Sequence, residues 1–330
     1  MSIKAIQKIA LFSIVAGSAT AISNTYNLSW AQVADTQEVS IQFQAMVGDK
    51  AFTCGSSYSN LGIAKSSVTP TDFRFYVSNI GLIDASGMVV PLQLEQDGKW
   101  QYQNVALLDF EDKSGSCANG TSETRTQVTG SVPAGDYKGI TFMLGVPFNL
   151  NHNDATLAPS PLNLTSMWWN WQGGYKFVRI DLENQKMAAN DGTQQQGDSH
   201  SQYDSHHKGQ RHNDQGHDHQ GHTQHGAIQG FLIHLGSTGC QMEGNSQQPK
   251  FCNHPNTSTF IFSEFNLAEN VIVADLAALV SESNLERNEP DTPLGCMSAL
   301  NDSDCTTIMN NFGIPYQGQP SSEQTFFRIE

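Results

Sequence analysis

The chain has 330 residues, six cysteines and a formal net charge of −15. This acidity argues against nucleic acid as a partner, because phosphate binding needs a basic surface, whereas a cation or a metal ion is compatible with it. The length fits one large β domain or two smaller ones and does not decide between them.

The N-terminus predicts a secretory signal. Lys4 and Lys8 precede an apolar run that begins at Ile9, and small residues follow up to Ile22. Lysines ahead of an apolar block fit export better than the alternative, a buried N-terminal helix. The run is shorter than the roughly 20 apolar residues of a spanning helix. We therefore expect residues 1–31 to be signal peptide and leader, and a periplasmic or secreted protein without a membrane span.

The six cysteines predict disulfides in an oxidising compartment. No two of them form a Cys-x-x-Cys pair, which disfavours a structural zinc site or a thioredoxin-like site. Six cysteines allow many connectivities, and all remain open from sequence alone. Proximity in the chain favours Cys240–Cys252 and Cys296–Cys305, which leaves Cys54–Cys117.

Short segments with period-two alternation dominate the chain and predict strands. They include 39–47, 73–77, 141–144 and 176–180. Such repetition is typical of an all-β fold, here an antiparallel β-sandwich or a barrel-like domain spanning 35–330. Helical periodicity is confined to short C-terminal stretches, 275–280 and 305–311.

A polar segment at 184–226 interrupts this pattern. It is rich in Gln, Gly, Asp and His and nearly free of large apolar residues, so we expect a disordered insert between strands at 175–182 and 228–234. Histidine-rich tracts bind transition metals loosely, and a solvated linker is the alternative. Eight of the eleven histidines lie here: His200, His206, His207, His212, His217, His219, His222 and His225.

Three histidines lie outside the insert. His152 follows a predicted strand, and His234 lies within an apolar one, where a hydrogen-bonded core histidine is the commoner outcome. His254 lacks the spacing of a blue-copper site.

Three tryptophans lie close together between His152 and His234: Trp168, Trp169 and Trp171. In an extended strand Trp168 and Trp169 would face opposite sides. The cluster fits core packing, and a carbohydrate-binding platform is an equally fair interpretation of the spacing.

Several separate motifs resemble the MbnP family, the four-Cys member of the "metallo-mystery pair". In chain order they are Thr71-Asp-Phe-Arg-Phe-Tyr-Val-Ser78, Val105-Ala-Leu-Leu-Asp-Phe-Glu111 followed by Cys117, Gly145-Val-Pro-Phe148 with Asn151-His152, Met167-Trp168-x-Asn-Trp171 with Gly174-Tyr-Lys-Phe177, His234-Leu-Gly-Ser-Thr-Gly-Cys240, and Gly295-Cys-Met297 with Cys305. The resemblance runs from about Val39 to Cys305. The His-rich insert departs from the family pattern.

The resemblance implies a periplasmic copper-binding protein and a dihaem partner of the MbnH type, related to bacterial cytochrome c peroxidases. That partner oxidises a tryptophan of the family member to kynurenine. Indole nitrogen is a poor ligand because its lone pair belongs to the ring, and ring opening frees an aromatic amine. Nitrogen donors of this kind suit copper better than calcium or magnesium.

The resemblance points to His152 and His234 as copper ligands and to one tryptophan as the oxidised position. Trp168 and Trp171 match the motif better than Trp169, and Met167 fits packing better than ligation. The chain has no Cys-x-x-Cys-His for covalent haem, so the oxidant would come from the partner. We expect no enzyme activity. A carbohydrate-binding or surface-adhesion module and a copper-dependent oxidase are the competing hypotheses.

Overall fold

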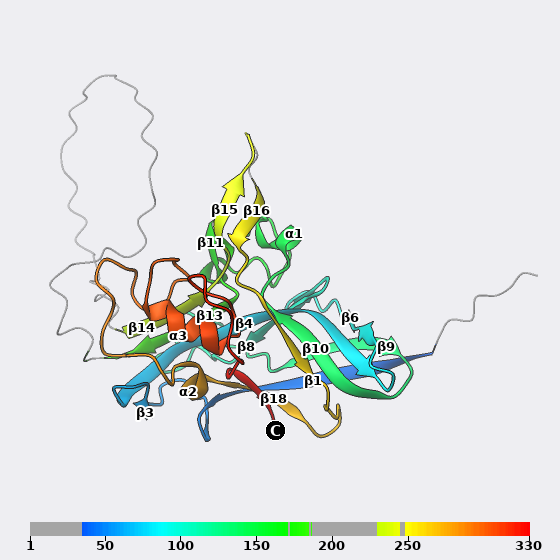
Figure 1. Cartoon of the computed structure of the whole chain (residues 1–330). Coiled ribbons are helices and arrows are strands. Elements are labelled where there is room, and N and C mark those ends of the chain that lie inside the picture. The colour runs from blue at the N-terminus through cyan, green and yellow to red at the C-terminus, as the bar shows by residue number, and fades with distance from the viewer. Residues whose placement is uncertain (1–34, 171, 185, 187–229, 245–247) are drawn as a thin grey trace, which may run out of the picture. The chain divides into compact units, whose positions relative to one another are not determined.

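Two β-sheets, one of six and one of nine strands, form the framework of this computed structural model (Figure 1). The structure describes residues 35–170, 172–184, 186, 230–244 and 248–330. The part from Asp35 to Glu330 is one compact unit. The expected signal peptide and leader lie outside the described residues, as do the eight tract histidines and Trp171.

The six-stranded sheet is centred on β1 (Thr36–Val47). Its other strands are β2 (Lys50–Ala51), β6 (Gln93–Leu94), β9 (Gln127–Pro133), β18 (Val271–Asp275) and β19 (Phe327–Ile329). The β1–β18 pair is parallel, and the remaining pairs of this sheet are antiparallel. A parallel pair cannot be closed by a hairpin, so it joins strands that are distant in the chain. This parallel pair is an exception in a sheet that is otherwise antiparallel, as expected.

The nine-stranded sheet is built on one long strand, β4 (Ser66–Asp84), with the main order β14-β13-β4-β10-β17. Its other strands are β3 (Tyr58–Leu61), β5 (Val89–Pro91), β7 (Gln101–Tyr102), β8 (Val105–Asp109), β10 (Tyr137–Leu144), β13 (Val178–Glu183), β14 (Gly230–Leu235) and β17 (Ser258–Phe262). Two further hairpins are β11 (Trp168–Asn170) with β12 (Gly174–Tyr175), and β15 (Thr238–Met242) with β16 (Pro249–His254).

Aromatic side chains join the two sheets face to face. The ring of Phe43 on β1 lies 6.1 Å from that of Phe75 on β4, and the rings of Phe142 on β10 and Phe327 on β19 are 5.2 Å apart. These pairs are edge-to-face, an arrangement worth about 0.5–1.5 kcal/mol beyond area burial. The sandwich predicted from alternation is therefore confirmed.

The two predicted C-terminal helices are present as α2 (Leu276–Leu279) and α3 (Asp304–Asn311). Asp275 caps α2, because its carboxylate accepts hydrogen bonds from the backbone N–H groups of Ala277 and Ala278. The sequence did not indicate the short turns α1 (Phe148–Asn151) and η1 (Thr165–Met167). Within the described ranges, no helix is long and apolar enough to cross a membrane.

Three disulfides are present: Cys54–Cys117, Cys240–Cys252 and Cys296–Cys305. Two of these are the pairs that chain proximity favoured, and Cys54–Cys117 is the pair that was left. Cys240–Cys252 joins directly opposite residues of the β15–β16 hairpin. Cys296–Cys305 ties α3 to a segment that runs along β14, where Ile233 and Cys296 form a parallel bridge.

The insert connects two paired strands, as predicted. β13 and β14 are antiparallel, with Glu183 opposite Gly230 at the end from which the insert leaves and to which it returns. Asn184 was expected to begin the insert, yet it is buried and donates a hydrogen bond of 2.7 Å to the carbonyl of Leu285. The folded unit therefore includes Asn184.

One face of the nine-stranded sheet carries buried charges. Arg74 on β4 lies opposite Arg179 on β13 and Asp109 on β8, and residues directly opposite each other share a face. Alternation places the neighbouring Phe73 and Phe75 on the other face, in the aromatic core. This buried charged layer consists of Asp72, Arg74, Asp109, Glu111, Asp181 and His234, together with the partly buried Arg179.

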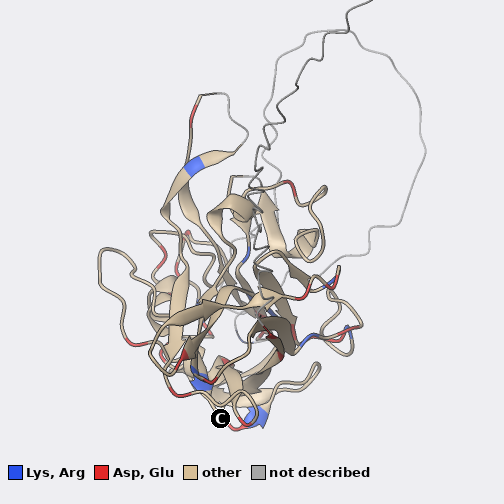
Figure 2. Cartoon of the chain, turned by 90° about the vertical axis from the view of Figure 1, so that its right-hand side faces the viewer, with Lys and Arg blue, Asp and Glu red and all other residues tan. Residues whose placement is uncertain are grey.

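Other charges are distributed over many loops (Figure 2). The exposed pair of Lys250 on β16 and Glu243 just after β15 has 3.0 Å between Nζ and Oε1. Exposed pairs contribute little to stability, whereas loss of one partner from a buried pair leaves a charge without compensation.

Arg74→Met should lower the free energy of unfolding by about 3–5 kcal/mol, because Glu111 would lose its buried counter-ion and Asp72 would keep only Arg179. Guanidinium denaturation of the disulfide-intact protein measures this loss. Lys250→Met removes the same charge type from the exposed pair and should change stability by about 0.5 kcal/mol at most. Equal effects of the two substitutions would contradict the role given to the charged layer.

Asp109→Asn should make the protein progressively more stable than wild type as pH rises from about 4 to about 8. Burial raises the pKa of Asp109 to about 8, whereas an unfolded aspartate titrates near pH 4. Between these values the folded state binds the extra proton, so wild-type stability falls with rising pH, by on the order of 1 kcal/mol per pH unit at most. Denaturation curves of both proteins across this range measure the difference, and a constant difference would refute the assignment.

Candidate metal site

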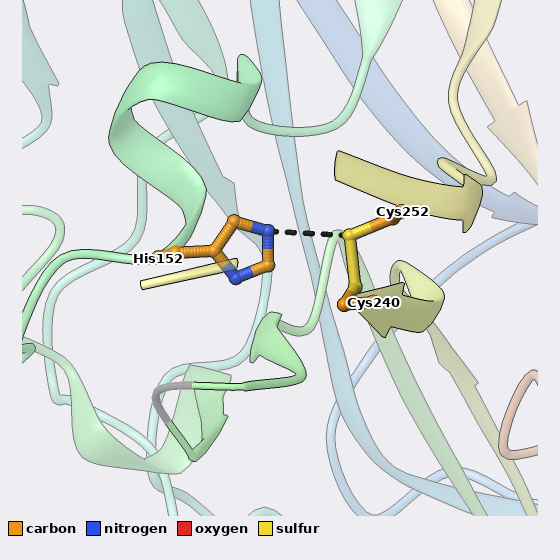
Figure 3. Close-up of side chains that lie close together, drawn as sticks. All are labelled: His152, Cys240 and Cys252. Atoms are coloured by element: carbon orange, nitrogen blue, oxygen red, sulfur yellow. Dashed lines mark hydrogen bonds between the residues drawn. A yellow bond between two sulfur atoms is a disulfide. The ribbon is translucent and has the colours of Figure 1, made fainter. Parts of the chain in front are cut away.

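His152 ends the turn α1 and is buried against a disulfide. Its Nε2 lies 3.4 Å from Sγ of Cys252 and 3.2 Å from Nδ2 of Asn151, and only 3% of the residue is exposed (Figure 3). Asn151 is itself fixed, because its Oδ1 accepts a hydrogen bond of 2.8 Å from the backbone N–H of Tyr175.

His152, Cys240 and Cys252 form a group whose ligand atoms all lie within 4.8 Å of one another. Two of the three atoms belong to a disulfide, and a thiolate is the form of cysteine that binds metals. The group is therefore not a cysteine metal site while the disulfide is intact. Among the described side chains, no such group of three contains both His152 and His234.

His234 is the next-to-last residue of β14, and its ring lies in the buried charged layer. Its Nε2 is 2.7 Å from Oδ1 of Asp181 on the neighbouring strand. Its Nδ1 is buried and has no hydrogen-bond partner within the described part of the chain. A buried polar atom without a partner costs about 1–3 kcal/mol, so this nitrogen needs an explanation.

The charge states of this pair follow from its surroundings. Burial lowers the pKa of His234 despite the opposing effect of Asp181, so the imidazole is neutral near pH 7. Burial alone would raise the pKa of Asp181, but His234 and two hydrogen bonds from Arg179 hold it below its usual value. Asp181 is therefore an ionised acceptor beside a neutral ring.

The two described tryptophans of the cluster lie in different surroundings. Trp168 is half-buried and packs against the core, and its Nε1 is buried without a hydrogen-bond partner among the described residues. Trp169 packs against Gly236, where an added Cβ would lie 2.3 Å from Cζ3 of the indole. Met167 is fully buried, as expected for packing.

Hydrogen bonds bring the segments of His152, His234 and the tryptophans to one end of β14. Asn151 Nδ2 lies 3.2 Å from Oγ of Ser237, three residues beyond His234. Gly236, between His234 and Ser237, contacts Trp169. The base of the β15–β16 hairpin, α1 and β11 meet here (Figure 1).

An open hollow of about 560 Å³ lies at this junction, lined in part by Trp169, Cys240 and Met297. A larger hollow of about 750 Å³ lies along β4, β5 and β6, but no His, Cys, Asp or Glu lines it. Cys240 is held in a disulfide, and neither His152 nor His234 lines either hollow, so neither hollow is by itself a metal pocket.

Sequence reasoning missed Asp181 and the other charges around His234. The available signal was the alternation of charged and apolar residues in Asp72-Phe-Arg74 and Arg179-Ile-Asp181. A polar face of a strand ordinarily faces water, so this pattern does not indicate burial.

The comparisons with known proteins agree with the sequence motifs. The sequence profile of the MbnP family matches residues 36–298. Among solved structures, MbnP from Methylosinus trichosporium superposes with a TM-score of 0.68 at 26% sequence identity, over 89% of this chain and 98% of that one. No significant match was found among curated proteins. With the profile covering most of the chain and a solved relative sharing its fold, this protein belongs to the MbnP family.

Proposed function

We propose that this protein binds copper outside the cytoplasm, for capture, storage or delivery, and that it is not an enzyme. The observation that carries the proposal is the buried Nδ1 of His234, which has no hydrogen-bond partner among the described residues. It lies near the end of β14 where the segments of His152 and the tryptophan cluster also meet. Imidazole nitrogens are ligands that suit copper.

The donor set fits a copper ion in two respects. His234 is neutral and buried, so its free lone pair is available without loss of a proton. His152 is also buried beside the same junction, although its nearest sulfur belongs to a disulfide. We assign these two imidazoles as ligands. A copper ion held by them would give the site its redox chemistry.

A third nitrogen donor would come from an oxidised tryptophan. Trp168 is favoured among the described tryptophans, because its buried indole nitrogen has no hydrogen-bond partner in the part of the chain that the structure describes. That same nitrogen becomes the free aromatic amine of kynurenine. Trp169 is less favoured since its ring is packed against Gly236, and Trp171 stays a candidate from the motif.

The oxidation needs a four-electron oxidant, which we assign to a dihaem protein of the MbnH type acting with peroxide. The C2–C3 bond of the indole breaks and each carbon gains one oxygen, while two molecules of hydrogen peroxide are reduced to water. Hydrolysis of the resulting N-formyl group then releases formate. The product has gained one oxygen and lost one carbon relative to tryptophan.

The location and the insert belong to the same proposal. Three disulfides among the described residues suit an oxidising compartment such as the periplasm, in keeping with the signal expected at residues 1–31. The His-rich insert leaves and re-enters the sheet beside β13 and β14, and we propose that it collects ions for the tighter site. The carbohydrate hypothesis is not favoured, because Trp168 packs against the core.

His152→Ala and His234→Ala should each weaken copper binding by on the order of tenfold to a hundredfold or more, since even outer-shell changes at metal sites cost this much. Competition with a chromophoric copper chelator, using protein purified from the native host, measures the affinity. His254→Ala is the matched control, because His254 is half-buried on the nearby strand β16 but outside the assigned set. If a variant that carries both His152→Ala and His234→Ala keeps the wild-type copper affinity, the assignment of this site is wrong.

Protein from the native host should carry one tryptophan that is heavier by about 4 Da, the balance of one oxygen gained and one carbon lost. Peptide mapping by mass spectrometry identifies the residue. Deletion of the gene for the dihaem partner should return the mass to that of tryptophan and weaken copper binding. An unmodified cluster in copper-loaded native protein would exclude kynurenine as a ligand.

A further inference from the structure

The two ring nitrogens of His234 have opposite surroundings. Nε2 lies 2.7 Å from a carboxylate oxygen of Asp181, whereas Nδ1 is buried without a partner among the described residues. The residue is only 5% exposed, so bulk water does not compensate Nδ1. The ring therefore presents one satisfied and one unsatisfied nitrogen in a fixed orientation.

Asp181 determines which nitrogen carries the proton. Its Oδ2 accepts hydrogen bonds of 2.9 and 2.8 Å from Nε and Nη2 of Arg179, which leaves Oδ1 for His234. An ionised carboxylate can only accept hydrogen bonds. Nε2 must then be the protonated nitrogen, and in a neutral ring Nδ1 keeps its lone pair.

Arg179 is itself held by a chain of alternating charges. Its Nε lies 3.0 Å from Oδ2 of Asp72, and Arg74, two residues further along β4 on the same face, pairs with the same carboxylate. These contacts cross the adjacent strands β4, β13 and β14 on one face of the sheet. The position of Asp181 is therefore set by the sheet and not by a flexible loop.

The same arginines anchor the tryptophan segment. Arg179 Nη1 donates a hydrogen bond of 3.0 Å to the carbonyl of Ser166, and Arg74 Nη1 donates one of 3.2 Å to its hydroxyl. Ser166 is two residues before Trp168. The charged chain thus fixes both the ring of His234 and the strand that carries the indole nitrogen without a partner.

We propose that Asp181 is a positioning residue that locks His234 in the Nε2–H tautomer, so that Nδ1 is the atom His234 offers to the copper ion. The inference rests on the proposed function. A carboxylate that accepts the second N–H of a ligating histidine fixes its tautomer and orientation and raises its basicity.

Asp181→Asn tests this directly. Arg179 has only donors, so the asparagine oxygen should face Arg179 and its NH₂ group should face Nε2 of His234. The imidazole proton should then move to Nδ1. Long-range ¹H–¹⁵N NMR of the metal-free protein should show protonated Nε2 in wild type and protonated Nδ1 in the variant.

Copper affinity, measured by competition with a chelator, should fall by about 10–100-fold in Asp181→Asn. Glu183→Gln is the matched control, because Glu183 is an exposed carboxylate on the same strand, and it should change neither the tautomer nor the affinity.

Two results would overturn the inference. The first is a wild-type protein whose His234 carries the proton on Nδ1, a measurement that does not depend on the variant being folded. The second is a folded Asp181→Asn variant with a shifted tautomer and unchanged copper affinity. Failure of the wild type itself to retain copper would instead reject the proposed function, since the tautomer is read without metal.

Discussion

The ion pair between Arg179 and Asp181 is the interaction on which the candidate site depends. The guanidinium occupies one carboxylate oxygen with two hydrogen bonds and leaves the other for His234. Three adjacent strands contribute to this arrangement, so it exists only when the sheet has formed in the correct register. A slip of one residue would place Asp181 on the aromatic face, where its charge would have no partner.

The nine-stranded sheet separates two kinds of interior. One face packs phenylalanines against the second sheet, which provides non-directional apolar burial. The other face encloses paired charges whose contribution to stability is small or negative relative to an apolar replacement. Buried charges that add little stability can instead serve to orient a side chain, and here the side chain that they orient is the ring of His234.

The disulfides hold the edges of this arrangement in place. Cys296–Cys305 anchors the segment along β14, where the backbone N–H of His234 donates to the carbonyl of Cys296 at 2.9 Å. Gly295 has a φ of +70°, and an added Cβ would lie 2.3 Å from the carbonyl oxygen of Leu232. Close approach of this segment to β14 therefore requires glycine at that position.

Local sequence patterns were sufficient to predict several of the main strands, the short helices at α2 and α3, the place of the insert and the chain-proximal disulfide pairs. Alternation and spacing are properties of neighbouring residues, and these elements depend on little else. The resemblance to the MbnP family directed attention to His152 and His234, but it did not indicate what surrounds either ring. Only the tertiary structure decided that His152 faces the Cys240–Cys252 disulfide and that Asp181 faces His234. Strand pairing joins residues that are far apart in the chain, and the sequence of a single strand does not reveal whether its charged face meets water or the charges of another strand.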